Sequence, residues 1–543
     1  MCEASFVLGQ SRFPLRYLIV GLLSAVSAGL ASPAAGQIVP VGEEIAVSQR
    51  DGDFESGASV AADRQGGWGV SWRAEDVDFA HPTGRQRRFD RNGGPLPGTL
   101  RDHELVGADL GLDGEGNGVL AGVRSRPELG GAEVDALCVD PQGATRGARV
   151  RVDAGAISAA TRRPSSVRVA TATDGTSIVV WQETPVDLVT PPSVFFRRLL
   201  TDCTPTGNVG SLGAVGVVGR REPEVASRPD GGFVLVFLEG EATDNLRVAA
   251  QQFGVDGEAL AASFQVSQTV VQPIFGPSVA VASDGEFAVV WRTFAAASLV
   301  PGGASSGISG RVFAADGTPL GGELPLRLPR PANATISSVA AVGASFVAAW
   351  AENGFVEEGS AVFGRAFEAA GPLGGEVGLN AEHTDPGDVR IAALGANEFV
   401  VVWDDLAEQT LPQDIVARRF VLAPPGAGCA ESPSALCLGA ERFRIAVEWR
   451  DYQGRHGSGH AYPLTSDSGL FWFFGDTNME VLVKVVNACA GFSRHWVYAA
   501  ATTDVEYTLT ATDTSTGRSR SYFNPLGRRS AAITDSDAFA TCP

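Results

Sequence analysis

The sequence has few residues of several kinds, and each shortage narrows the class of protein. Lys484 is the only lysine among 42 lysine and arginine residues, against 62 aspartate and glutamate residues. The formal net charge of −20 argues against nucleic acid and anionic membrane surfaces as partners, because both repel an acidic protein. After residue 30, no apolar run approaches the roughly 18 residues that a transmembrane helix needs. We therefore expect no transmembrane segment once a signal peptide is removed.

The sequence also lacks several short motifs that would identify a reaction type. It contains no His-Glu-x-x-His zinc motif and no phosphate-binding glycine loop. His456 and His460 have a spacing that suits a metal site only on a helix, and the glycines between them disfavour a helix. We interpret them as ordinary loop histidines. The sequence thus predicts no catalytic residue.

The N-terminal segment has the layout of a secretory signal. Arg12 and Arg16 precede an uncharged run over residues 17–30, and small residues lead to a cleavage site near Gly36. We predict a signal peptide over residues 1–36. The mature protein is then secreted, and it stays in the periplasm, on the cell surface or outside the cell.

Removal of the signal peptide leaves an even number of cysteines, which in an exported chain favours disulfides over zinc. They are Cys138, Cys203, Cys429, Cys437, Cys489 and Cys542. We favour the pair Cys429–Cys437, which closes a short loop, and the pair Cys489–Cys542, which ties down the chain end. A bridge between Cys138 and Cys203 requires neighbouring repeats to stay within the roughly 4.4–6.8 Å Cα separation of a disulfide.

One pattern recurs along the first 420 residues. It consists of a short apolar strand, an Asp-Gly turn and an apolar strand that ends in a large aromatic residue, and its clearest copy runs from Pro277 to Trp291. A degenerate copy over residues 113–122 lacks the aromatic residue. The other copies end at Trp72, Trp181, Phe237, Trp350 and Trp403. The spacing of roughly 50–60 residues is typical of propeller blades and solenoid repeats.

The second half of each unit adds two strands, and the ends of the array indicate a closed ring. An Arg-x-Phe strand such as Arg311–Phe313 precedes a turn and a segment of the Pro-Leu-Gly type. Four strands joined by hairpins form a propeller blade, so the chain resembles β-propeller repeat proteins of the secreted bacterial type. The last unit stops after Phe420 without a fourth strand, and residues 41–49 resemble the fourth-strand segment 262–268. We predict an all-β fold with a seven-bladed β-propeller over residues 37–424, closed by the N-terminal strand; six or eight blades are the alternatives.

The repeat stops near Cys429, and the remaining residues form a second unit. Short strand-like runs separated by turns predict a C-terminal antiparallel β-sandwich with disulfides over residues 425–543. Several segments carry a resemblance: Leu436-Cys-Leu, Gly469-Leu-Phe-Trp-Phe-Phe, Leu482-Val-Lys-Val, Thr503-Asp-Val-Glu-Tyr-Thr-Leu and Tyr522-Phe-Asn-Pro-Leu. They resemble a domain of unknown function at the C-termini of many secreted bacterial proteins. The resemblance implies export and fold and no activity, and a sorting signal for export is one role left open.

Acidic residues follow the aromatic residue in most units. Loops that join the same pair of strands lie on the same face of a propeller, so these residues should meet on one face. The candidate ligand-binding residues are Glu75, Asp76, Glu183, Glu239, Glu352, Asp404 and Asp405. Clustered carboxylates attract Ca²⁺, which is the cofactor this pattern suggests. We favour the other interpretation, a solvated acidic face, because no loop has the regular alternation of a Ca²⁺ loop.

Two functions remain open. The variable loops on a repeated scaffold favour a monomeric binding or interaction protein that recognises a protein or carbohydrate ligand. The alternative is a glycan-active hydrolase or lyase. Two carboxyl groups about 5–10 Å apart in a central pocket, one with a raised pKa, would favour the enzyme. A flat acidic face would favour binding.

Overall fold

The structure is a computed structural model of the chain. It describes residues 38–48, 53–75, 82–126, 131–154, 162–187, 189–213, 218–241, 246–268, 274–294, 306–330, 333–334, 337–353, 361–380, 385–406, 413–423, 429, 432–440 and 442–542. The predicted signal peptide and Asp76 lie outside these residues. The described residues are mostly strands, with one short helix, α1 (Cys489–Phe492). None of the helices among them is long and apolar enough to cross a bilayer.

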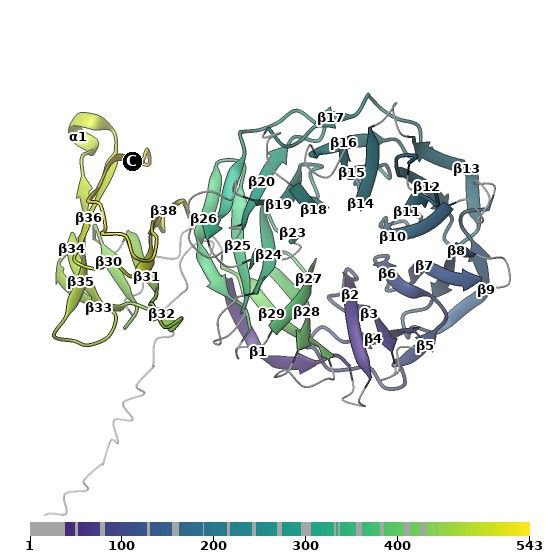
Figure 1. Cartoon of the computed structure of the whole chain (residues 1–543), viewed down its shortest axis with the longest axis horizontal. Coiled ribbons are helices and arrows are strands. Elements are labelled where there is room, and N and C mark those ends of the chain that lie inside the picture. Colours follow the sequence, from purple (N-terminus) through teal and green to yellow (C-terminus); the bar gives the residue numbers. More distant parts are fainter. Residues whose placement is uncertain are drawn as a thin grey trace, which may run out of the picture.

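Residues 38–422 form seven antiparallel sheets that follow one another around a ring (Figure 1). The first four, in chain order, are β2 (Phe54–Ala62), β3 (Trp68–Glu75), β4 (Thr83–Phe89) and β5 (Arg101–His103); β6 (Val106–Leu112), β7 (Gly118–Arg126), β8 (Gly131–Val139) and β9 (Thr145–Arg151); β10 (Arg162–Thr171), β11 (Ser177–Pro185), β12 (Ser193–Leu199) and β13 (Pro205–Leu212); and β14 (Gly219–Ser227), β15 (Phe233–Gly240), β16 (Arg247–Phe253) and β17 (Phe264–Gln265).

The remaining three sheets complete the ring. They are β18 (Ile274–Val281), β19 (Phe287–Phe294), β20 (Ser306–Phe313) and β21 (Leu324–Arg330); β22 (Asn333–Ala334), β23 (Ser338–Val342), β24 (Ser345–Asn353), β25 (Ala361–Glu368) and β26 (Gly371–Gly378); and β27 (Asp385–Ala393), β28 (Glu398–Leu406) and β29 (Gln413–Leu422) with β1 (Ile38–Ala46).

The two ends of this region meet in the seventh sheet. β1 pairs antiparallel with β29, with Val41 opposite Arg419 and Ala46 opposite Val416. The innermost strands contact one another around the whole ring, and β27 contacts β2. The predicted pairing of the N-terminal strand with the last, incomplete unit is therefore confirmed. Four-stranded antiparallel sheets in a ring define a β-propeller.

The recurring Asp-Gly pairs form tight hairpin turns. In the clearest copy, Gly285 donates its backbone N–H to the Ala282 carbonyl over 3.0 Å, and its φ is +90°. A side chain is disfavoured at that φ, which explains the glycine. The Asp284 carboxylate accepts the N–H of Glu286 over 3.0 Å and so fixes the turn. The predicted hairpin is confirmed.

The large aromatic residues that end the second strands fill the space between adjacent sheets. Trp403 packs against Val347 and Ala349 of the preceding sheet, in one cluster with Phe399. All six are at most 1% exposed: Trp72, Trp181, Phe237, Trp291, Trp350 and Trp403. They hold neighbouring sheets together and do not line a ligand-binding mouth.

Residues 435–539 form two further sheets that share one hydrophobic core. The first contains β30 (Ala435–Leu438), β31 (Phe443–Arg450), β32 (His456–Ser458), β37 (Glu506–Asp513) and β38 (Ser519–Asn524); the second contains β33 (His460–Thr465), β34 (Ser468–Trp472), β35 (Met479–Asn487), β36 (His495–Ala501) and β39 (Ile533–Phe539). The first sheet contacts the ring through β26, where Gly374 donates its N–H to the Gly517 carbonyl over 3.3 Å. The strands β33 to β35 of the second sheet lie on the side away from the ring (Figure 1).

The described cysteines form three disulfides. Cys429–Cys437 and Cys489–Cys542 are the pairs that the sequence favours, and both are confirmed. Cys138 and Cys203 also pair, with their Cα atoms 5.8 Å apart, and they join the second and third sheets. Outer strands of these neighbouring sheets therefore stay close enough for a bridge.

Candidate functional site

Most of the predicted acidic site residues lie inside the sheets. Five of them are between 3% and 7% exposed: Glu75, Glu183, Glu239, Glu352 and Asp404. Asp405 is partly buried, and Asp76 is outside the described residues. The expectation that these carboxylates form a solvated face is wrong for the five buried residues. The physical reason is that the second strand of each sheet continues past its aromatic residue. The carboxylate therefore belongs to the strand and is buried, and it does not lie in a loop.

The buried carboxylates satisfy buried indole groups. Trp181 donates its indole N–H to Glu183 over 3.0 Å, and Trp350 donates to Glu352 over 3.1 Å. A buried indole N–H without an acceptor costs about 1–3 kcal/mol, so a glutamate two residues further along the strand is a matched partner. These glutamates therefore stabilise the sheets.

Arginines neutralise two of the same carboxylates. Arg327 lies 2.5 Å from Glu352, and its side chain is fully buried. Glu239 lies 2.9 Å from Arg220 and 2.7 Å from Arg247. Burial alone would raise the pKa of Glu239, but the hydrogen bonds from the two arginines outweigh it and lower the pKa. The two arginines therefore favour the ionised form of Glu239 within the protein.

The innermost strands carry a second, different set of polar groups. Six of them contain a register shift, and in β2 the shift places Gly57 at a φ of +66°. The shift frees a backbone N–H, which a side chain of the preceding sheet then binds. Asp404 accepts the N–H of Gly57 over 3.0 Å, and Gln182 accepts the N–H of Glu222 over 2.9 Å. These bonds link consecutive sheets at the inside of the ring.

Charged side chains from four sheets interact in the ring interior. Arg168 on β10 donates to Glu224 on β14 over 2.7 Å, and Arg390 on β27 lies 3.7 Å from the same carboxylate. Asp109 on β6 accepts the N–H of Val169 over 2.7 Å. Arg168 and Glu224 remain 24% and 20% exposed, so solvent reaches them. We call Asp109, Arg168, Glu224, Asp388, Arg390 and Asp404 the interior cluster.

Asp404 has the most perturbed carboxyl group in this cluster. Burial, and then the nearby charge of Asp388, raise its pKa to about 7, although the N–H groups of Gly57 and Ala58 act in the opposite direction. Burial also raises the pKa of Asp109, against the opposing effect of Arg168. Carboxyl groups whose pKa is raised in this way are typical of functional sites.

The raised pKa of Asp404 predicts a dependence of stability on pH. The folded protein holds this proton up to about pH 7, whereas the unfolded chain releases it near the ordinary value of 3.8. The free energy of unfolding should therefore fall as pH rises between these values, by at most about 4 kcal/mol from this group. Urea unfolding at pH 5 and pH 8 measures the change. In Asp404→Asn the change should be smaller, while Glu258→Gln on the exposed surface should behave as the native chain does.

A pocket of about 690 Å³ lies beside the disulfide Cys138–Cys203. Turns of the first three sheets line it with carboxylates, amides, hydroxyls and two arginines. The charged lining residues are Arg64, Asp113, Glu115, Arg146, Asp174 and Asp202. None of the predicted acidic site residues contributes to this pocket. Its lining suits a polar ligand.

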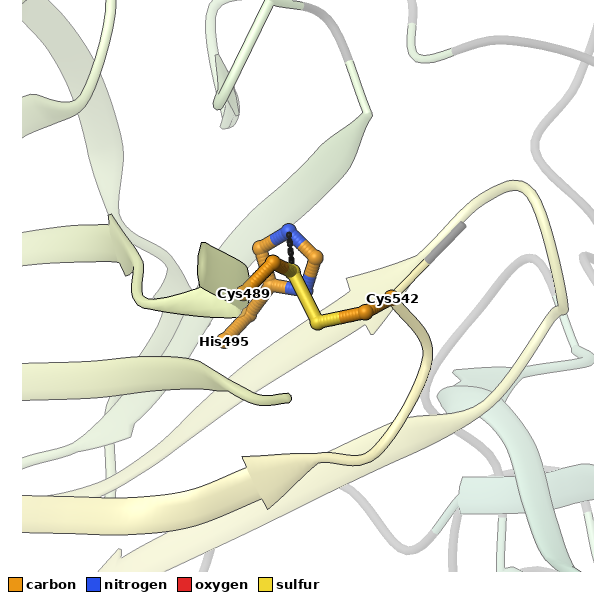
Figure 2. A group of neighbouring side chains, drawn as sticks. All are labelled: Cys489, His495 and Cys542. Atoms are coloured by element: carbon orange, nitrogen blue, oxygen red, sulfur yellow. Dashed lines mark hydrogen bonds between the residues drawn. A yellow bond between two sulfur atoms is a disulfide. The ribbon is translucent and has the colours of Figure 1, made fainter. Parts of the chain in front are cut away.

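A group of potential metal ligands in the C-terminal region is engaged in a disulfide. The Sγ atom of Cys489 lies 3.5 Å from Nε2 of His495 and is bonded to Cys542 (Figure 2). The buried His495 ring also packs against Phe443, with the ring centroids 4.9 Å apart. Because both sulfurs share a covalent bond, this group holds the chain end in place.

Comparisons with known proteins give structural likenesses only. No protein-family model and no curated relative matches the chain. A protein of unknown function from Dyadobacter fermentans is 12% identical with a TM-score of 0.42, over 71% of this chain and 99% of its own. The polysaccharide lyase Uly1 is 9% identical with a TM-score of 0.43, over 72% and 100%. An α-L-arabinofuranosidase from Fusarium graminearum is 10% identical with a TM-score of 0.40, over 72% and 98%.

The interior cluster is the part of the site that sequence reasoning missed, apart from Asp404. Some of its members are charged residues flanked by apolar residues within a strand, such as Asp109 between Ala108 and Leu110, and Arg168 between Val167 and Val169. A charge in such a position requires a buried partner, which is the signal that would have found it. The partner itself lies in another repeat and cannot be read from the local sequence.

Proposed function

We propose that this chain is an exported glycan-active enzyme, a hydrolase or lyase, built on a seven-bladed propeller. In this proposal residues 1–36 are a signal peptide, residues 37–424 form the propeller and residues 425–543 form a β-sandwich. The mature protein is a secreted monomer, and its partner is a carbohydrate. The interior cluster, which includes Asp404, is the reaction site, and the other acidic residues buried beside the aromatic residues stabilise the blades.

One observation carries the proposal: Asp404 and Asp388 are neighbouring carboxyls, and the pKa of Asp404 is raised to about 7. A carboxyl that keeps its proton near neutral pH can protonate a departing glycosidic oxygen. In the proposed reaction Asp404 is that acid, and the partly exposed Asp388 is the base. Arg168 and Arg390 place two cations nearby, where they would bind the oxygen-rich substrate or its carboxylates.

The test is polysaccharide cleavage by the mature chain across neutral and uronate-containing polymers. We expect release of reducing ends, or of unsaturated ends if the enzyme is a lyase. Asp404→Asn should lower kcat about 10²–10⁴-fold, because the proton donor is lost. The native rate should decline above about pH 7, where Asp404 ionises. Glu258→Gln is the control for loss of a surface charge and should retain full activity.

A polymer that is cleaved equally by the native chain, Asp404→Asn and Asp388→Asn would contradict the proposal. If no polymer is cleaved, the binding-protein hypothesis gains support. The pocket beside Cys138–Cys203 is the observation that favours it, since a polar concavity with four carboxylates suits a polar ligand or Ca²⁺. Thermal shifts with the same polymers and with Ca²⁺ would then identify the ligand, because a ligand that binds the folded state raises Tm.

A further inference from the structure

The second C-terminal sheet has one buried face and one exposed face. Along β34 and β35 the side chains alternate: Phe471 and Val483 enter the shared core, whereas Trp472 and Leu482 point outward. The other C-terminal sheet contacts the ring through β26, and the strands β33 to β35 of this sheet lie on the side away from the ring (Figure 1). We call the outward side chains of β33, β34, β35 and β36 the outer face.

The outer face is rich in aromatic rings. Its residues are His460, Tyr462, Leu464, Ser468, Leu470, Trp472, Leu482, Lys484, Val486, Trp496, Tyr498 and Ala500. His460 stacks on Trp472 with a centroid distance of 3.8 Å and an angle of 12° between the rings. The ring centroids of Trp496 and Tyr498, two residues apart on β36, are separated by 6.0 Å. Tyr462 is 53% exposed and Leu482 is 44% exposed.

The charge of the outer face differs from that of the whole protein. The chain carries a net charge of −20, yet none of the outward residues named above is an aspartate or a glutamate. The one permanent charge is the ammonium of Lys484, which lies 5.5 Å from the centre of the Tyr498 ring. Within the described residues Lys484 makes no salt bridge. The named residues thus carry one positive charge and no negative charge, on a protein that is acidic as a whole.

We propose that the outer face binds an acidic polysaccharide, that is, a polymer containing uronate sugars. The exposed Tyr462 ring and the partly exposed rings of Trp472, Trp496 and Tyr498 can stack on the apolar faces of sugar rings, and the tyrosine hydroxyls can bond sugar hydroxyls. Lys484 pairs with the carboxylate of a uronate, and none of the named outer-face residues carries a carboxylate that would repel it. Binding involves hydrogen bonds and stacking only, with no covalent step.

The same charges disfavour an anionic bilayer. A membrane surface extends beyond one sheet and meets the acidic remainder of the protein, which it repels, whereas a single polymer strand contacts the outer face alone. Attraction is screened beyond a Debye length of about 8 Å, so Lys484 acts on a polymer strand that lies directly on the outer face. The proposal goes beyond the cleavage reaction and is independent of the interior cluster.

The experiment measures binding of the full mature chain to soluble polygalacturonate and alginate, with neutral xylan and arabinan as comparison polymers. We expect the native chain to bind the uronate polymers more tightly than the neutral ones, and added salt to weaken the difference. Trp472→Ala and Trp496→Ala should each weaken uronate binding at least about 10-fold, since stacking of one ring on its ligand is lost. Lys484→Ala should remove the preference for uronate, and Lys484→Arg should keep it.

Matched controls separate binding from folding and from cleavage. Tyr452→Ala removes an exposed aromatic ring outside this sheet and should bind as the native chain does. Asp404→Asn should also bind normally, so loss of the proposed reaction would leave this result intact. Unchanged melting temperatures show that the outer-face variants are folded; a variant that fails this check is replaced by Trp472→Leu or Trp496→Leu.

Three results would overturn the proposal. The first is the absence of uronate binding by the native chain, or binding that both tryptophan variants retain. The second is equal binding of neutral and acidic polymers by the native chain and Lys484→Ala. The third is a different partner for the outer face. In that case the chain sediments as a dimer or binds anionic vesicles, Trp472→Ala abolishes this association, and no polymer binds.

Discussion

A mature chain that lacks residues 38–48 is expected to lose its cooperative fold. Without β1, strand β29 becomes an open edge, and Ile38, which is buried against the sixth and seventh sheets, no longer fills its place. The backbone bond from Val47 to Ile415 is also lost. We expect a loss of roughly 5 kcal/mol or more, which is comparable with the whole stability of an ordinary domain. Urea unfolding followed by circular dichroism measures it, and size-exclusion chromatography should show aggregates formed through the open edge.

A synthetic peptide of residues 38–48 provides the control for this deletion. Added to the shortened chain, it should restore part of the melting temperature, because its binding site on β29 is complete. A peptide of the same composition in scrambled order should have no effect. If the shortened chain instead unfolds as a stable monomer close to the native midpoint, the closure does not hold the ring together.

Replacement of Arg327 by methionine should be among the most destabilising single changes in the ring. The Arg327 side chain is fully buried, contacts Glu352 at 2.5 Å and donates to the Ser306 carbonyl. Methionine fills the volume but removes the cationic partner of the buried Glu352 carboxylate. Removal of one partner of a buried pair costs about 3–5 kcal/mol. Urea unfolding at pH 7 measures the loss.

The double variant Arg327→Met with Glu352→Gln tests the physical reason. It removes both charges and keeps an acceptor for the Trp350 indole, so it should be more stable than Arg327→Met alone. Arg73→Met is the control, since Arg73 is half exposed and its contact with Glu75 should be worth less than about 1 kcal/mol. Additive effects of the two single changes would show that Arg327 and Glu352 do not interact.

The sheets and the ring closure could be predicted from the sequence, because both are indicated by local sequence patterns. The turn at Asp284-Gly285 and the alternation that leads to Trp291 fix a hairpin without reference to the rest of the chain. The fourth strand of the last unit could be found because residues 41–49 resemble an internal strand. Two of the three disulfides followed from simple loop and chain-end arguments.

The candidate site could not be read in the same way. Glu183 and Glu352 follow their aromatic residues as loop residues would, and only the observed strand length shows that they are buried. A strand that continues for two more residues converts an expected ligand group into a partner for an indole. The interior cluster is harder still, because Glu224 and Arg390 belong to different repeats. Only the closed ring brings them within 3.7 Å.

The pairing of β1 with β29 also sets a waiting time during synthesis. Ser48 and Ile415, which bond to each other across this junction, are separated by 367 residues. At roughly 5–20 residues per second, the ribosome needs about 20–70 seconds to supply the partner of a strand it has already finished. Contacts between residues so far apart in the sequence form slowly, so β1 has no β29 to pair with during this entire interval. A holdase that covers residues 38–48 until translation ends would therefore raise the yield of native rings more than one that covers any interior strand.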